Sequence, residues 1–183
     1  MANTTYIGGA VLADTVYLNG AIVGRDVEVT LPAVEYATID LAAMGTYSKP
    51  IPQLIEHMEV GFSKIDTGLW CKNVNAAGEN NIEVRWAQDI TTPNGGTRTI
   101  GLKAFLRGES ANIPELGIVV GESSEAQNNV SLSKYAVFQD GKELFYIDRW
   151  ADVNRVGGKD LNVALNKFLY IVCLVYTMVR NII

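Results

Sequence analysis

The sequence contains little of what metal centres, disulfide frameworks and nucleic-acid-binding faces require. Only two cysteines are present, Cys71 and Cys173, and they lie far apart without a histidine nearby, so neither a zinc site nor a disulfide framework is indicated. We expect both to be buried, reduced thiols. Lys and Arg number 15 against 20 Asp and Glu, which gives a formal net charge of −5, and no basic run occurs. This balance argues against a dedicated nucleic-acid-binding protein, because such a protein needs clustered cations to displace counterions.

Segments typical of secretion or membrane insertion are also missing. The apolar run Ile7–Leu12 has no Lys or Arg before it and is followed closely by Asp14, so we do not expect a signal peptide. The uncharged stretch Phe168–Val179 is shorter than the roughly 20 residues that a membrane span needs, and stable membrane insertion is not expected. With 183 residues, of which 48% are apolar, the chain predicts a single domain over 1–183.

Strands joined by tight turns dominate the pattern. Asp-Gly and Asn-Gly pairs supply the positive-φ residues that two-residue hairpin turns need. In the stretch 97–107, Ile100, Leu102, Ala104 and Leu106 fall on one face of a strand. Three hairpins are therefore predicted: Val16–Leu18 with Ala21–Val23 across Asn19–Gly20, Ile82–Gln88 with Thr97–Arg107 across Thr92–Gly96, and Tyr135–Phe138 with Leu144–Ile147 across Gln139–Glu143, which contains Asp140-Gly141.

The remaining segments receive less regular assignments. Val27, Val29 and Leu31 share one face of a strand that Pro32 ends. The three tryptophans are expected in the core or at an interface. We further predict a long connection over Ala37–Gln53, a strand over Leu54–Phe62 whose spacing also fits a helix, a short helix within Lys64–Trp70, an exposed loop over Glu109–Asn129, and a helix over Leu161–Phe168 with Asp160 as its N-cap.

Candidates for chemistry are few. His57, the single histidine, lies between Glu56 and Glu59 and is interpreted as structural, since one histidine cannot form a multi-histidine metal site. Gly157-Gly158-Lys159 lacks the spacing and the following Ser or Thr of a phosphate loop, and Asn94-Gly95-Gly96 joins two strands, so both are interpreted as turns. The sequence therefore predicts no catalytic residue, no cofactor and no metal. A mainly β chain with long strands must instead cover or share its sheet edges.

The order of features resembles that of the major tail tube protein of contractile-tailed bacteriophages and R-type bacteriocins, over roughly residues 15–168. The features that carry the resemblance are, in order, Tyr17-Leu18-Asn19-Gly20, Val29-Thr30-Leu31-Pro32, the Met44-Gly45 loop, the strand that ends Leu106-Arg107-Gly108, and the Asp140–Asp148 hairpin with Val156-Gly157-Gly158-Lys159-Asp160 after it.

This resemblance implies a β-sandwich-like subunit with long hairpins and one or two short helices. Such subunits form hexameric rings, join their strands into one β-barrel around a lumen, and stack into a tube inside a contractile sheath. The tube is driven through a target cell envelope. Further implied partners are tape-measure and baseplate proteins, and double-stranded DNA, which passes through the lumen without specific binding. The implied location is a virion tail or tail-like particle assembled in the bacterial host cytoplasm.

In this family the loop matching Ala37–Gln53 contacts neighbouring subunits and the next ring, and the lumen wall is commonly acidic. The deficit of positive charge suits such a wall, because a basic wall would hold the phosphates of DNA. The contact residues that the resemblance assigns to this loop are Met44, Gly45, Tyr47, Pro50 and Pro52.

The chain departs from the family at its C-terminal end. Family members tend to end near Phe168-Leu169, whereas this chain continues with the apolar segment 170–183. Contiguous apolar surface is costly to expose, so we expect this segment to be buried within the subunit or against a neighbour. The residues expected in this packing are Phe168, Tyr170, Leu174 and Tyr176.

Two other classes of function remain open on the residues alone. The chain could be a monomeric β-sandwich binding or adhesion module, or a small enzyme that uses His57 with a nearby carboxylate. Electron microscopy of the purified protein would distinguish the binding module from the tube subunit. Rings or hollow tubes would indicate the tube subunit, and strictly monomeric particles would indicate the binding module.

Overall fold

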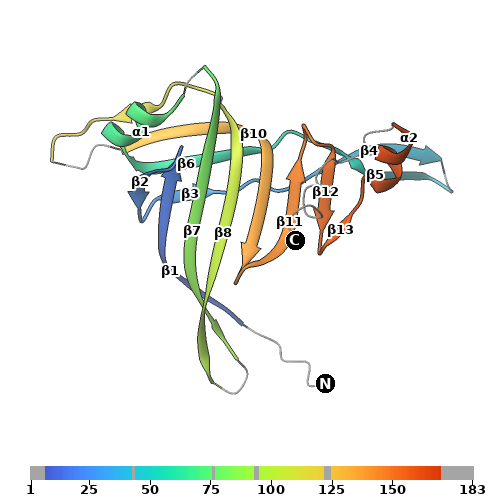
Figure 1. Ribbon diagram of the computed structural model, residues 1–183, viewed down its shortest axis with the longest axis horizontal. Helices are drawn as coiled ribbons and strands as arrows, with labels where there is room; N and C mark the ends of the chain where they lie inside the picture. Colours follow the sequence, from blue (N-terminus) through green and yellow to red (C-terminus); the bar gives the residue numbers. More distant parts are fainter. Residues whose placement is uncertain (1–6, 43, 76, 93–94, 122–124, 170–183) are drawn as a thin grey trace, which may run out of the picture.

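The computed structural model describes residues 7–42, 44–75, 77–92, 95–121 and 125–169. Strands make up most of this part of the chain, and two short helices complete it (Figure 1). The helices are α1 (Thr67–Asn73) and α2 (Val163–Phe168). The strands are β1 (Ile7–Leu18), β2 (Ala21–Arg25), β3 (Glu28–Thr30), β4 (Tyr36–Ala42), β5 (Thr46–Ile55), β6 (Glu59–Asp66), β7 (Glu79–Thr91), β8 (Thr97–Ser110), β9 (Glu115–Gly117), β10 (Glu125–Gln139), β11 (Lys142–Asp148), β12 (Val153–Val156) and β13 (Lys159–Asp160).

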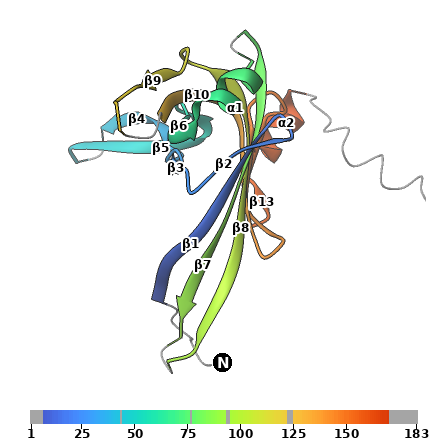
Figure 2. The same ribbon diagram turned by 90° about the vertical axis from the view of Figure 1, so that its left-hand side faces the viewer.

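The strands form one large antiparallel sheet of two layers and a separate hairpin. The main layer has the order β13-β12-β11-β10-β8-β7-β1-β2, and β6, β3 and β9 branch from it through β10. The long strand β10 connects the layers, because its first half pairs with β6 and β9 and its second half pairs with β8 and β11. Figure 2 shows the second layer and α1 on one side of the tall main layer. This arrangement confirms the predicted mainly β, sandwich-like class, and in the described residues the sheet does not close into a barrel.

The three predicted hairpins are confirmed. Asn19 and Gly20 have φ of 50° and 84°, and Asp140 and Gly141 have φ of 47° and 80°, as a type I′ turn requires. The β7–β8 hairpin is the longest, with an unbroken register from Glu79↔Glu109 to Thr91↔Thr97. Its length carries β7 and β8 well beyond the second layer (Figure 2), so among the described residues no second layer covers the β7–β8 turn end of the main sheet.

The hydrophobic core lies between the two layers. Alternation places Ile100, Ala104 and Leu106 inward from β8 while Lys103 and Arg107 point outward, as the sequence predicts. Trp70 of α1 is fully buried and stacks at a tilt on Phe62, with ring centroids 5.0 Å apart. The other core side chains include Val16, Leu18, Val23, Met58, Val60, Ile65, Ile82, Val84, Val130, Leu132, Tyr135, Val137 and Ile147.

Two predicted irregular segments are wrong because they contain strands. The segment Ala37–Gln53 is not a loop but belongs to the hairpin β4–β5, which turns at Met44–Gly45. Its prolines are tolerated because, among the described strands, β5 pairs only with β4 and leaves its other edge free. The segment Glu109–Asn129 likewise contributes the end of β8, all of β9 and the start of β10.

Two further predictions are corrected locally. The strand predicted over Leu54–Phe62 is broken at residues 56–58, where the guanidinium of Arg149 donates to the backbone oxygens of Ile55 and Glu56 and the chain passes from the hairpin to the main sheet. Helix α1 begins at Thr67, because the Asp66 carboxylate accepts from the Leu69 N–H at 2.7 Å.

The C-terminal helix is capped differently from the prediction. Asn162, not Asp160, occupies the N-cap of α2, and the Asp160 carboxylate accepts from the backbone N–H of Asn162 at 2.9 Å. Cys71 is exposed rather than buried, since Trp70 is the only residue that α1 buries. Trp150 is also exposed, in contrast to Trp70. Cys173 lies outside the described residues.

Candidate assembly surfaces

Both ends of the main layer have open edges. Strand β2 covers β1 only from Thr15 to Leu18, whereas β7 covers its other side from Ile7 onward. In the part of the chain that the structure describes, no strand therefore pairs with the outer edge of β1 between Ile7 and Asp14. The opposite end of the layer is β13, which has only two residues. Unpaired backbone groups on such edges are templates for pairing with another chain.

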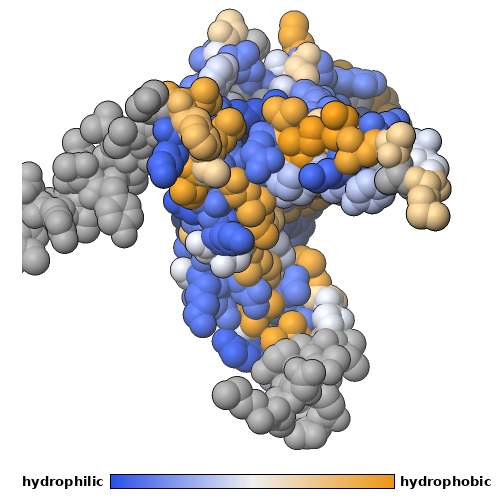
Figure 3. Space-filling view, turned by 90° about the vertical axis from the view of Figure 1, so that its right-hand side faces the viewer, coloured by the Kyte–Doolittle hydropathy of each residue, from blue (hydrophilic) through white to orange (hydrophobic). Residues whose placement is uncertain are grey.

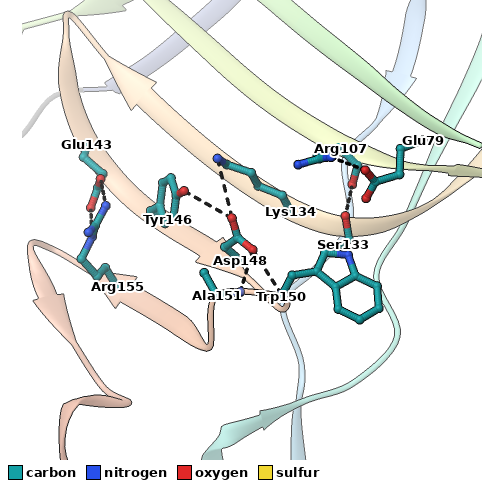
Figure 4. A network of polar contacts seen from close by, with 10 residues as sticks. All are labelled: Glu79, Arg107, Ser133, Lys134, Glu143, Tyr146, Asp148, Trp150, Ala151 and Arg155. Atoms are coloured by element: carbon teal, nitrogen blue, oxygen red, sulfur yellow. Dashed lines mark hydrogen bonds and ion pairs between the residues drawn. The ribbon is translucent and has the colours of Figure 1, made fainter. Parts of the chain in front are cut away.

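The face of the main layer opposite the core carries paired charges. Glu79 with Arg107 and Glu83 with Arg85 are ion pairs on β7 and β8, the second at 2.6 Å. Lys134 pairs with Asp148 at 3.7 Å. Figure 4 shows that Asp148 also accepts from the backbone N–H groups of Trp150 and Ala151, which fixes the turn after β11. Acids and cations thus alternate across this face.

An aromatic ring is held between two cations on the same face. The Nζ atom of Lys134 lies 4.7 Å from the ring centroid of Tyr146, and the Cζ atom of Arg155 lies 4.5 Å from it. The guanidinium of Arg155 binds both carboxylate oxygens of Glu143, at 3.1 and 2.9 Å (Figure 4). This bidentate hydrogen bond raises the pKa of Arg155. The strands β10, β11 and β12 are therefore tied together by side chains as well as by their backbone ladder.

The hairpin β4–β5 projects away from the main layer, and only a few contacts hold its base. The buried amide of Asn154 donates to the backbone oxygen of Pro52 at 2.7 Å, and Gln53 donates to the backbone oxygen of Leu161 at 3.3 Å. Sequence reasoning missed Asn154 because a lone asparagine in a short strand carries no signal. Of the predicted contact residues, Met44, Gly45 and Tyr47 lie at or next to the exposed tip, Pro50 lies midway along β5, and Pro52 lies at the base.

Apolar side chains are also exposed around α2. Phe168 is 79% and Val163 is 61% exposed, and Leu165 and Leu169 are exposed beside them. Figure 3 faces the end of the molecule that carries β4–β5 and α2, and it shows apolar surface gathered over this end. Tyr170, Leu174 and Tyr176, which we predict to pack here, lie outside the described residues.

An open sheet edge, a projecting hairpin and exposed apolar patches are the features of a subunit that assembles. Comparison with known protein families shows which kind of assembly this subunit belongs to. The family described as phage tail tube protein FII matches residues 11–168. The chain belongs to the phage tail tube family. No curated protein matches the chain. Membership of this family implies assembly into a tube with other tail proteins.

The tail tube family is a structural one, and the protein is a component of a phage tail. His57 is exposed between β5 and β6, where its ring faces Glu59 at 3.5 Å. Within the described ranges, no group of three or more His, Cys, Asp or Glu side chains is arranged to hold a metal ion. None of the helices in the described residues is long and apolar enough to cross a membrane.

Proposed function

We propose that this tail tube protein is the inner tube subunit of a contractile phage tail or a phage-tail-like bacteriocin. Copies form hexameric rings, and the rings stack into a hollow tube that sheath contraction drives through the envelope of the target cell. The protein carries out no reaction and uses no cofactor. The single observation that carries this proposal is the open outer edge of β1 between Ile7 and Asp14 in a chain of the tail tube family.

In this proposal the main layer continues from one subunit to the next. The outer edge of β1 bonds to the β11–β13 end of a neighbour, so that the ring has no free edge. Each backbone group at the boundary then gains a hydrogen-bond partner, which gives a stiff wall without covalent links. The long β7–β8 and β10–β11 hairpins, which extend beyond the second layer, form the wall of the lumen.

The hairpin β4–β5 is assigned to contacts with neighbouring subunits and the next ring. Its exposed tip residues Met44 and Tyr47 reach outside the subunit, and a two-stranded hairpin is only marginally stable unless something packs on it. The remaining proposed partners are the sheath around the tube, the tape-measure protein within it and the baseplate at its end. Assembly takes place in the bacterial host cytoplasm.

The face opposite the core is assigned to the lumen. Its acids are matched by cations in pairs such as Glu83 with Arg85 and Lys134 with Asp148, so the wall is mixed rather than strongly acidic. Neutralised pairs leave few cations free to bind phosphates. Double-stranded DNA can therefore pass without specific binding, and the same wall serves a particle without DNA.

Electron microscopy of the purified, concentrated protein tests the proposal. We expect rings or hollow tubes, because another copy can pair with the open β1 edge, and we propose six subunits per ring from the resemblance to contractile tail tubes. A His57→Ala variant should assemble like the wild type, since this exposed side chain lies in no proposed contact. Strictly monomeric particles at high concentration would contradict the proposal and favour a binding module.

Removal of residues 170–183 is expected to reduce both assembly and solubility. The exposed side chains of Val163, Phe168 and Leu169 adjoin this apolar segment in the chain, and we propose that they pack with Tyr170, Leu174 and Tyr176 within the subunit or against a neighbour. Sedimentation and electron microscopy of a chain ending at Leu169 provide the measurement. Unchanged solubility and tube yield would refute this packing.

A further inference from the structure

The hairpin β4–β5 has one apolar face that the other described residues of its subunit leave uncovered. The register pairs Ile39 with Lys49 and Leu41 with Tyr47, so these four side chains project from the same side of the hairpin. We call this set the hairpin face. Asp40 lies on the other side, where it accepts a hydrogen bond from Ser48. All four side chains of the hairpin face are exposed, so the hairpin is amphipathic but its apolar side meets no core.

A second exposed apolar segment is the stretch of residues 111–121, which we call the β9 arm. Ile118 is 81% and Val120 is 102% exposed, and Ile113, Leu116 and Val119 are exposed as well. The arm is attached to the sheet by the short pairing of Glu115–Gly117 with β10 and by the hydrogen bond from the Ala111 N–H to the Asn129 backbone oxygen. So many large apolar side chains on one short segment mark a contact surface.

The two surfaces complement each other in charge as well as in apolarity. Lys49 lies within the hairpin face and Glu115 within the β9 arm, and both side chains are exposed. Among the described residues neither of them forms an ion pair. A contact between the two surfaces would therefore bring a cation to an acid inside a mainly apolar patch, which fixes the register of the contact.

The two surfaces lie at opposite ends of the subunit. In Figure 1 the β9 arm, coloured yellow to gold, extends to the left, whereas β4–β5 extends to the right. They therefore cannot meet within one subunit. In a ring or tube of identical subunits the contact is heterologous, which means that two different patches of the same chain face each other across the boundary.

We propose that the β9 arm of one subunit packs on the hairpin face of another copy, with Glu115 against Lys49. This inference rests on the proposed tube function and names the surfaces that meet. Ile118 and Val119 cover Leu41 and Tyr47, and the marginally stable hairpin gains the apolar layer that the described part of its own subunit does not provide.

Charge reversal tests the pairing. Lys49→Glu alone and Glu115→Lys alone each place like charges in the contact, and each should reduce the fraction of protein in tubes about tenfold or more. The chain that carries both changes restores the opposite charges, and its tube yield should return to near the wild-type value. Circular dichroism confirms that each variant subunit is folded. If the double variant assembles no better than the single ones, the pairing is wrong.

Disulfide trapping tests the apolar contact directly. In a background with Cys71 and Cys173 replaced by serine, one chain carries Ile118→Cys and a second, size-tagged chain carries Leu41→Cys. Oxidation of co-assembled tubes should join the two kinds of chain and give almost no product from either alone. Ser48→Cys in place of Leu41→Cys is the matched control, because it lies on the other side of the hairpin, and it should not crosslink.

The outcomes separate this inference from the proposed function. If the wild-type protein forms tubes but co-assembled Ile118→Cys and Leu41→Cys chains do not crosslink, the arm-to-hairpin contact is wrong and the tube function still stands. In a separate chain that keeps Cys173 and carries Cys71→Ser and Ile118→Cys, crosslinking of Cys173 to position 118 would show that segment 170–183 occupies the arm. That result would also overturn the arm-to-hairpin contact. Absence of any wild-type assembly would refute the tube function itself.

Discussion

A Trp70→Ala variant is expected to lose about 3–5 kcal/mol of folding free energy, the range typical of removing a large aromatic side chain from a core. Trp70 is fully buried and is the only residue of α1 that enters the core. Its ring packs on Phe62, in the second layer of the sheet. The cavity left by alanine would detach α1 from the core, because this short helix has no other buried anchor.

Urea denaturation of the unassembled subunit, followed by far-ultraviolet circular dichroism, measures this loss. Trp70→Phe is the matched control, since it keeps an aromatic ring against Phe62. The buried indole Nε1 of Trp70 has no hydrogen-bond partner among the described residues, so phenylalanine also removes an unsatisfied donor. The control should therefore lose much less than the alanine variant. Equal losses would show that Trp70 is not the anchor of α1.

Gly108→Ala is expected to destabilise the subunit by roughly 3 kcal/mol, at the upper end of the usual cost of overpacking. Gly108 is buried in β8 opposite Leu132 of β10. A Cβ at this position would lie 2.0 Å from the backbone oxygen of Ser131 and 3.0 Å from the Cα of Leu132. Backbone atoms cannot rotate away as a side chain does, so β8 and β10 must separate locally.

Gly101→Ala supplies the control on the same strand. No heavy atom lies within 4 Å of the position that its Cβ would take, and the residue is exposed. Its effect should stay within about 0.5 kcal/mol, as for other surface substitutions. Thermal and urea unfolding of the two variants give the comparison. A Gly108→Ala subunit as stable as Gly101→Ala would mean that the two strands are not in such close contact.

Assembly offers a second readout for both destabilising variants. Trp70 and Gly108 are buried and lie in none of the proposed contact surfaces. Where the variant subunits remain folded, they should therefore enter tubes at the wild-type ratio. Loss of assembly without loss of folding would place one of these residues in an interface.

The sequence by itself determined the turns and the strand alternation, because these features depend on residues that are adjacent in the chain. Asn19-Gly20 and Asp140-Gly141 predict their turns because both residues of each pair must take positive φ, which these residue types tolerate. Alternation in β8 predicts its inward side chains because successive residues of a strand point to opposite faces. The order of these signals also led to the tail tube family, which the match over residues 11–168 shows.

The sequence pattern predicts a strand poorly where the strand does not pack against the core, as in the hairpin β4–β5. Ile39 and Leu41 alternate with Thr38 and Asp40 as in any half-apolar strand, yet the prolines of β5 favoured a loop. The hairpin tolerates them because β5 has a free edge. Whether an edge is free depends on what lies beside it in space, and a sequence read residue by residue does not contain that information.

Only the tertiary structure decided which distant strands are neighbours and which surfaces stay uncovered. The pairing of β1 with β7, the open edge of β1 and the close approach at Gly108 all depend on hydrogen-bond register between segments far apart in the chain. Register is a collective property of two strands and of the core beneath them, whereas turn formation is decided within a few residues. For this reason the sequence predicted the hairpins of the tail tube subunit, and the fold alone located the surfaces through which its copies can meet.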